Sequence, residues 1–147
     1  WQKGPVNLDE PPMGPHQARV LQEGAQVTIA TYGPMTAVAL QAAEIAASEG
    51  TSIEVIDLRS LSPIDFDTVI NSVKKTGRLI VASEASTFVS ISSEIAARVA
   101  EKAFYHLEAP VLRVGGFDVP YPAAKLEEVF LPDADRILEA VDRVLSY

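Results

Sequence analysis

The chain has 147 residues and a formal charge of −8, from 20 acidic and 12 basic side chains, and it contains no cysteine. Nucleic-acid binding needs clustered Lys and Arg, so this charge argues against a nucleic-acid partner. It allows a basic protein partner, or an acidic surface that only keeps the protein soluble. The lack of cysteine excludes disulfides and Cys-ligated metals and fits a cytoplasmic location. No apolar run approaches the ~20 residues that span a bilayer, so no membrane partner is expected.

Residues 1–16 differ from the rest of the chain, because they hold four of its ten prolines and show little periodicity. Such a stretch is typical of a linker or an extended arm rather than a core element. The first residue is Trp1 and not Met. We therefore expect residues 1–16 to be an arm from a missing N-terminal domain, and residues 17–147 to form one folded domain.

Five short apolar stretches rich in β-branched residues predict strands at 18–21, 27–31, 53–56, 79–82 and 111–114. The first two are separated only by a turn at Glu23 and Gly24. So short a connection indicates an antiparallel pair, joined as a hairpin.

Helical patterns follow four of these strands. One has Val38, Ala42, Ile45 and Ala46 on one face and ends at Gly50; the others are expected at 65–75, from Ser92 onward with Ile95, Val99 and Ala103 inward, and at 133–145 with Ile137, Val141 and Val144 inward. Strands that alternate with helices predict an α/β fold. We expect a three-layer α/β/α domain whose five-stranded sheet is mainly parallel, with the first strand antiparallel.

Ligands of such sheets usually lie at the carboxyl ends of the strands, so these ends are the first place to search. Tyr32-Gly33-Pro34 is no phosphate-binding motif and is typical of a tight turn into a helix. Asp57 and Arg59 follow the third strand, and Asp65 begins the next helix. The first two residues could pair, hold the loop, bind an anion or face another subunit; we favour the structural role.

The remaining chemistry is sparse. Glu84 at a strand end could be a general acid or base, but a cap or loop contact is favoured, and the serines near 90–93 are more often caps than an anion site. His16 and His106 are isolated and make no metal site by spacing. We predict no catalytic, cofactor-binding or metal-binding residue in this chain.

Several motifs in a fixed order carry a resemblance to a known family. They are VTIATYG at 27–33, DLRSLSPID at 57–65, KTGRLIV at 75–81, EA at 84–85, SEIAA at 93–97, LEAP at 107–110 and RVGGFDVPYP at 113–122. Across residues 17–147 the chain resembles the transketolase-type C-terminal domain of the β subunit of thiamine-diphosphate-dependent 2-oxo acid dehydrogenases, the E1 component. It looks most like the bacterial branched-chain (2-oxoisovalerate) enzymes, with pyruvate and acetoin dehydrogenases as alternatives.

The resemblance implies an α2β2 oxidoreductase that decarboxylates a 2-oxo acid on thiamine diphosphate with Mg²⁺ and then acylates the lipoyl group of the E2 component. The cofactor would lie between the α subunit and the missing β N-terminal domain, so this chain alone is expected to be inactive and to bind none. The domain would contact the α subunit and a second β subunit, and Asp57, Arg59 and Asp65 would shape a loop or a subunit contact.

The resemblance also implies that this domain docks the basic subunit-binding domain of E2. The acid of the LEAP motif and the chain's terminal carboxylate would carry part of that contact, which corresponds to Glu108 and Tyr147. The chain departs from the family at Ser83, where His is common, and at Ser90 and Ser92, where glycine is common. Serine is less permissive than glycine, so we expect the loop to differ in shape.

A rival hypothesis from another class is a stand-alone flavodoxin-like module that binds a small molecule. Trp1 and the proline-rich arm argue against it, because they resemble a junction between domains. The reading frame upstream of Trp1 would discriminate between the two hypotheses.

Overall fold

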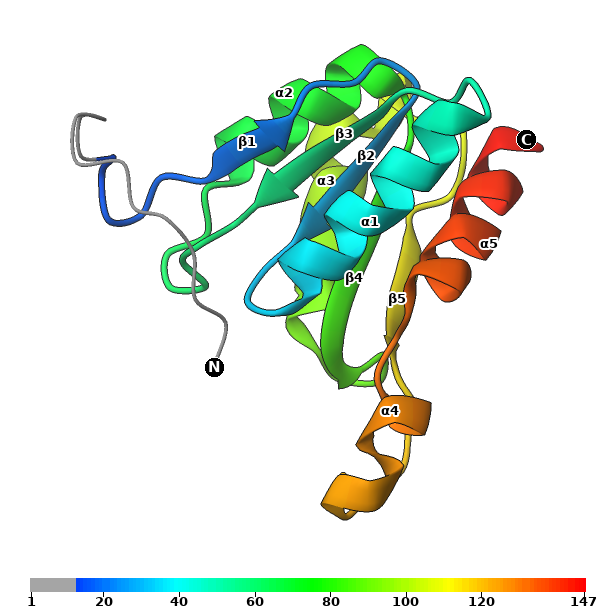
Figure 1. The fold of residues 1–147 in the computed structure, drawn as a ribbon. Coiled ribbons are helices and arrows are strands. Elements are labelled where there is room, and N and C mark those ends of the chain that lie inside the picture. Colours follow the sequence, from blue (N-terminus) through cyan, green and yellow to red (C-terminus); the bar gives the residue numbers. More distant parts are fainter. Residues whose placement is uncertain (1–12) are drawn as a thin grey trace.

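The computed structural model describes residues 13–147, which form a five-stranded sheet with helices on both faces (Figure 1). The predicted arm therefore lies almost wholly outside the described residues. The sheet order is β1-β3-β2-β4-β5, and its strands are β1 (Arg19–Gln22), β2 (Val27–Thr31), β3 (Ile53–Asp57), β4 (Leu79–Ser86) and β5 (Leu112–Gly116). β1 is antiparallel to its neighbour and the other pairings are parallel, which confirms the predicted fold class.

The predicted hairpin between the first two strands is wrong. β1 pairs with β3, where Arg19 lies opposite Asp57 and Val20 opposite Ile56. β2 lies between β3 and β4, so both of its edges are already paired. The short turn instead carries the chain past the start of β3 at Gly24, where a Cβ atom would lie 2.1 Å from the Ile53 carbonyl carbon.

Two helices cover each face of the sheet. α1 (Met35–Ser48) and α5 (Ala134–Leu145) pack together on one face, and α2 (Phe66–Thr76) and α3 (Ile91–Ala103) on the other (Figure 1). Short elements complete the fold: η1 (Phe104–His106), η2 (Ala124–Leu126) and α4 (Glu127–Phe130). The last two belong to an excursion that projects from the carboxyl end of β5 in Figure 1.

Local sequence explains where the helices begin and end. The Asp65 side chain caps α2, and Lys74 and Lys75 occupy its last turn, as the helix dipole favours. Gly77 ends the helix with a left-handed φ of 71°, a conformation that glycine adopts without steric cost. The Asp133 side chain caps α5 in the same way.

Each face of the sheet has its own apolar core. On the α5 side, Ile137, Val141 and Val144 are buried as predicted, and on the α3 side Ile95, Val99 and Ala103 are buried as predicted. Burying a Val or Ile side chain contributes about 1.5–3 kcal/mol. None of the helices within residues 13–147 combines the length and the apolar character needed to cross a bilayer.

The buried face of α1 is broader than its pattern predicted. Met35, Ala39 and Ala43 are buried together with the predicted Ala42 and Ala46, while the predicted positions 38 and 45 are only partly buried against the core. Small alanine side chains let the helix backbone approach the sheet closely. More of the helix surface is therefore buried than a single row of apolar residues would cover.

Candidate partner-binding site

The candidate site is built around Glu108, which lies between η1 and β5. Its backbone N–H donates to the Gly77 carbonyl at 2.8 Å, so the segment before β5 is fastened to the end of α2. A Cβ atom on Gly77 would lie 2.8 Å from both Cγ and Cδ of Glu108. The glycine is thus required twice here, for its positive φ and for the space that the glutamate side chain fills.

Arg78 fixes the Glu108 carboxylate. Its Nη1 lies 2.7 Å from Glu108 Oε2, and its Nε donates to the Val144 carbonyl at 3.0 Å in the last turn of α5. The arginine is 19% exposed, whereas Glu108 remains 61% exposed. The guanidinium therefore contacts both the Glu108 carboxylate and the C-terminal helix α5. The carboxylate still faces solvent.

Tyr147 lies three residues beyond Val144 and is 64% exposed. Through Arg78, the structure joins the segment that carries Glu108 to the helix that leads to Tyr147. The sequence search missed Arg78. One signal was available in the sequence: Arg78 stands directly between Gly77, which ends α2, and the buried strand β4. A long side chain at such a junction reaches the elements that pack around it.

The predicted loop residues Asp57 and Arg59 do not pair through their side chains. Asp57 Oδ1 accepts the backbone N–H of Arg59 at 3.0 Å, which supports a positive φ of 56° at that residue. The Arg59 guanidinium instead donates to the carbonyls of Gln17 at 3.0 Å and Gly14 at 3.3 Å. These contacts hold the segment that leads into β1.

Asp65 serves the same segment from the other end of the loop. Its Oδ1 accepts the Thr68 N–H at 3.1 Å, and its Oδ2 accepts the Ala18 N–H at 3.0 Å and the Thr68 hydroxyl at 2.8 Å. Burial raises the pKa of this carboxyl, but the hydrogen bonds outweigh burial and the pKa is lowered. The geometry gives Asp57, Arg59 and Asp65 structural contacts within the chain, and a subunit contact for them stays a prediction.

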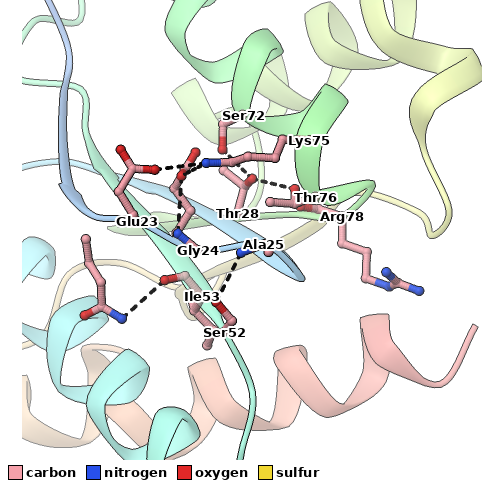
Figure 2. A network of polar contacts seen from close by, with 12 residues as sticks. Glu23, Gly24, Ala25, Thr28, Ser52, Ile53, Ser72, Lys75, Thr76 and Arg78 are labelled. Carbon is pink, nitrogen blue, oxygen red and sulfur yellow. Dashed lines mark hydrogen bonds and ion pairs between the residues drawn. The ribbon is translucent and has the colours of Figure 1, made fainter.

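A second polar cluster lies at the end of β3 opposite to the loop at residues 57–65, at the same end of the sheet as Arg78 (Figure 2). Glu54 on β3 is 3% exposed and pairs with Lys75 of α2, which also contacts Glu23 at 3.0 Å. Burial raises the pKa of Glu54. The hydrogen bonds with Lys75, Ser72, Glu23 and the Gly24 backbone outweigh burial, so the pKa is lowered. Deeper in the same cluster, the Thr28 hydroxyl bonds the hydroxyls of Ser72 at 2.6 Å and Thr76 at 2.7 Å.

The network in Figure 2 links the β1–β2 turn, β3 and α2, so its contacts are those of a structural clamp. Glu54 lies within the apolar strand predicted at 53–56, where no role was predicted for it. A charged residue in such a strand signals a buried partner, since an unpaired buried carboxylate is costly.

Of the three serines that depart from the family pattern, Ser83 lies in β4, and Ser90 and Ser92 lie at the start of α3. The Ser83 and Ser92 hydroxyls are buried and lie 3.0 Å apart, so they satisfy each other. Ser90 occupies the N-cap position, but its hydroxyl makes no cap hydrogen bond and is buried without a partner among the described residues. The expectation of serine caps is therefore wrong for Ser90.

No group of three or more His, Asp or Glu side chains within residues 13–147 is placed to hold a metal ion. His16 Nδ1 lies 3.2 Å from the Ser60 hydroxyl, and His106 is exposed in η1. Glu84 is half-buried within β4. His16 is thus held at the loop before α2, and His106 lies two residues before Glu108.

The sequence of the chain matches one known domain family and the β subunits of 2-oxo acid dehydrogenases. The model of the family described as "Transketolase, C-terminal domain" matches residues 16–137. The pyruvate dehydrogenase E1 component subunit beta of Leifsonia xyli is 60% identical over the whole chain, which covers 44% of that relative. The 3-methyl-2-oxobutanoate dehydrogenase subunit beta of Mycobacterium tuberculosis is 49% identical over 92% of the chain and 39% of the relative. The chain thus spans less than half the length of these curated relatives.

Among solved structures, one titled "Split gene transketolase, inactive beta4 tetramer" superposes with a TM-score of 0.79. The two sequences are 34% identical. The superposition covers 91% of the chain described here and 44% of the transketolase chain.

Proposed function

Because the chain belongs to the transketolase C-terminal domain family, we propose that it is the C-terminal domain of the β subunit of a 2-oxo acid dehydrogenase E1 component. The observation that carries this proposal is 60% identity over the whole chain to such a β subunit. The enzyme would decarboxylate a 2-oxo acid with thiamine diphosphate and acylate the E2 lipoyl group. It would work in the cytoplasm as an α2β2 assembly.

Within residues 13–147 no group of three or more acidic or histidine side chains is placed to hold a metal ion. The turn Tyr32-Gly33-Pro34 at the carboxyl end of β2 is no phosphate-binding motif. We therefore propose that the cofactor is held elsewhere in the enzyme, and we assign no catalytic step to this domain.

An assembly role is supported by a concentration of exposed apolar side chains around the excursion after β5. Soluble monomers rarely expose large contiguous apolar patches, and such patches usually mark contacts with other proteins. Seven large side chains here are at least half exposed: Phe88, Val89, Phe117, Val119, Tyr121, Leu126 and Val129. We propose that this surface meets the α subunit or another part of the β subunit.

Docking of E2 is proposed at Glu108 and Tyr147. Both side chains are more than half exposed, and Arg78 links the elements that carry them. A carboxylate that is held in place yet faces solvent suits a Lys or Arg of a basic partner, and the charge of −8 would steer such a partner toward this protein.

Two substrates are supported by different observations. The resemblance of the motifs favours a branched-chain 2-oxo acid, as does the 49% identical 3-methyl-2-oxobutanoate dehydrogenase subunit. The 60% identical pyruvate dehydrogenase subunit favours pyruvate. Kinetics of the E1 heterotetramer with pyruvate and with 3-methyl-2-oxobutanoate would decide between them by the ratio of kcat/KM. Activity with neither, in the presence of thiamine diphosphate and Mg²⁺, would refute the proposed function.

A further inference from the structure

A small cavity lies between β5 and α5, two elements that pack side by side (Figure 1). It has a volume of about 190 Å³. β5 is the last strand of the described sheet, with β4 on its other side, so the cavity borders a free strand edge. Residues 112–114 of β5 form one wall, and Arg136, Glu139, Ala140 and Arg143 of α5 form the other. Drug-sized ligands need about 300–1,000 Å³, so this cavity fits a small ion or group.

The cavity collects positive charge in an acidic protein. Three of the chain's 12 basic side chains line it, Arg113, Arg136 and Arg143, against the single acid Glu139, so the lining carries a formal charge of +2. The α5 residues are spaced by three and four positions and therefore form one stripe along the helix. Arginine stays charged at any physiological pH, and its planar fork of N–H groups matches an oxyanion. The lining thus selects for an anion.

Arg136 stands at one end of the stripe and has a hydrogen-bond donor to spare. Its Nη2 donates to the Gly115 carbonyl at 2.6 Å, and its guanidinium lies 4.9 Å from the centroid of the Phe117 ring. Its Nη1 is buried and finds no acceptor within residues 13–147. A buried donor without an acceptor is costly. Because the side chain as a whole is only partly buried, a small turn of the guanidinium would bring this donor to the cavity.

Arg143 stands at the other end of the stripe. It is exposed, and among residues 13–147 its guanidinium has no hydrogen-bond or ion-pair partner, not even Glu139 one turn before it. The small side chain of Ala140 leaves the space between the two ends open. Arg113 donates through Nη1 to the Ser93 hydroxyl at 2.7 Å, so it adds charge to the cavity from a fixed position on β5.

We propose that this cavity binds a phosphate group, either as the free ion or as the end of a small phosphomonoester. Arg136 and Arg143 hold its oxygens from the two ends of the stripe, and Arg113 contributes charge. A phosphate group carries about 1.5 to 2 negative charges at neutral pH, which balances the lining, whereas a carboxylate would leave one positive charge unbalanced. A diphosphate chelated to Mg²⁺ is bulkier and largely neutralised, so it is not an expected ligand. The site shares no lining residue with the docking site at Glu108 and does not depend on the proposed function.

The test is isothermal titration of the 147-residue chain with inorganic phosphate, with glycerol 3-phosphate and with pyruvate, at constant ionic strength. We expect saturable binding of the two phosphates at millimolar concentrations. Arg143→Gln should weaken it about fivefold, and Glu139→Gln should strengthen it about threefold, because the first removes a cation and the second an opposing charge. The matched control is Arg98→Gln, which makes the same change of charge on α3, outside the cavity, and should leave binding unchanged. Phosphate should also raise Tm of the wild type more than that of Arg143→Gln.

Opposite shifts in the Arg143 and Glu139 variants would support the site, and the tighter of the two phosphates would identify the free ion or the monoester as its source. Phosphate binding that neither variant alters, or that Arg98→Gln alters equally, would place the anion elsewhere and overturn the proposal. Pyruvate binding as tight as phosphate would overturn the assignment to a phosphate group. A wild type without saturable phosphate binding would overturn the site itself, and each of these results would leave the proposed function untouched.

Discussion

Arg78 Nη1 lies 2.7 Å from Glu108 Oε2, and the same guanidinium donates through Nε to the Val144 carbonyl at 3.0 Å. One side chain thereby joins the end of α2, the entry to β5 and the end of α5. Because Arg78 is mostly buried while Glu108 is mostly exposed, the arginine has a structural position and the glutamate an accessible one.

We expect Arg78→Gln to destabilise the domain by about 1–2 kcal/mol, because it removes a charged hydrogen bond to Val144 and the partner of Glu108. The matched control is Arg98→Gln. Arg98 pairs with Glu94 at 3.2 Å on the exposed surface of α3, with 44% and 55% exposed side chains, and lies 5.2 Å from the centroid of the Phe66 ring. Its loss should cost less than about 1 kcal/mol. Urea unfolding measures both values, and equal losses for the two variants would contradict a special role for Arg78.

Gly77 and Gly50 offer a matched pair for the space around Glu108. Both have a positive φ, but a Cβ on Gly77 would lie 2.8 Å from the Glu108 side chain, whereas a Cβ on Gly50 would meet nothing within 4 Å. Gly50→Ala should therefore cost only the backbone strain, about 1 kcal/mol. Gly77→Ala should cost more than this in the same unfolding experiment and should also weaken E2 docking. Identical losses of stability with unchanged docking would show that Glu108 moves aside freely.

Lys75→Met should be the most destabilising of these substitutions, because it leaves the buried Glu54 carboxylate without its cation. Breaking a buried pair by removing one partner typically costs about 3–5 kcal/mol, and the 44% exposure of Lys75 places the expectation at the lower end of that range. The neighbouring exposed Lys74→Met is the control. The double variant Glu54→Gln/Lys75→Met should recover part of the loss in chemical unfolding; a double variant as unstable as the sum of the single variants would refute the pairing argument.

Acid should destabilise the domain through Asp65. The pKa of this carboxyl is lowered in the folded state from its ordinary value of 3.8. A depressed folded pKa means that stability is fully present above the unfolded pKa and is lost as pH falls through the folded pKa. We therefore expect Tm to fall as pH drops below about 4, and to fall less steeply in Asp65→Asn than in the wild type. An unchanged slope in Asp65→Asn would disprove the assignment.

The chain by itself should not bind thiamine diphosphate, because the proposed function places the cofactor in another part of the enzyme. Isothermal titration with thiamine diphosphate and Mg²⁺ should show no saturating heat. Stoichiometric binding would place a cofactor site within this domain and contradict the proposed division of roles.

Sequence patterns were informative where the cause is local. Asp65, the two lysines at 74 and 75 and Gly77 mark the ends of α2 because capping, dipole and left-handed φ are properties of neighbouring residues. The five strands and four long helices follow from periodicity for the same reason. The pairing of β1 with β3 did not follow, because apolar periodicity reports that a strand is buried and carries no information about which strand lies beside it.

The sequence alone determined the fold class, the element boundaries to within a few residues and the resemblance carried by its ordered motifs, since these depend on short-range spacing. The tertiary structure decided which side chains meet. Arg78 contacts Glu108 and Val144 only because α2, the β5 entry and α5 converge at one end of the sheet. Glu54 can be buried as a carboxylate because Lys75 of α2 forms an ion pair with it. Such contacts join residues that are distant along the chain, and the packing of the whole domain is what brings them into reach.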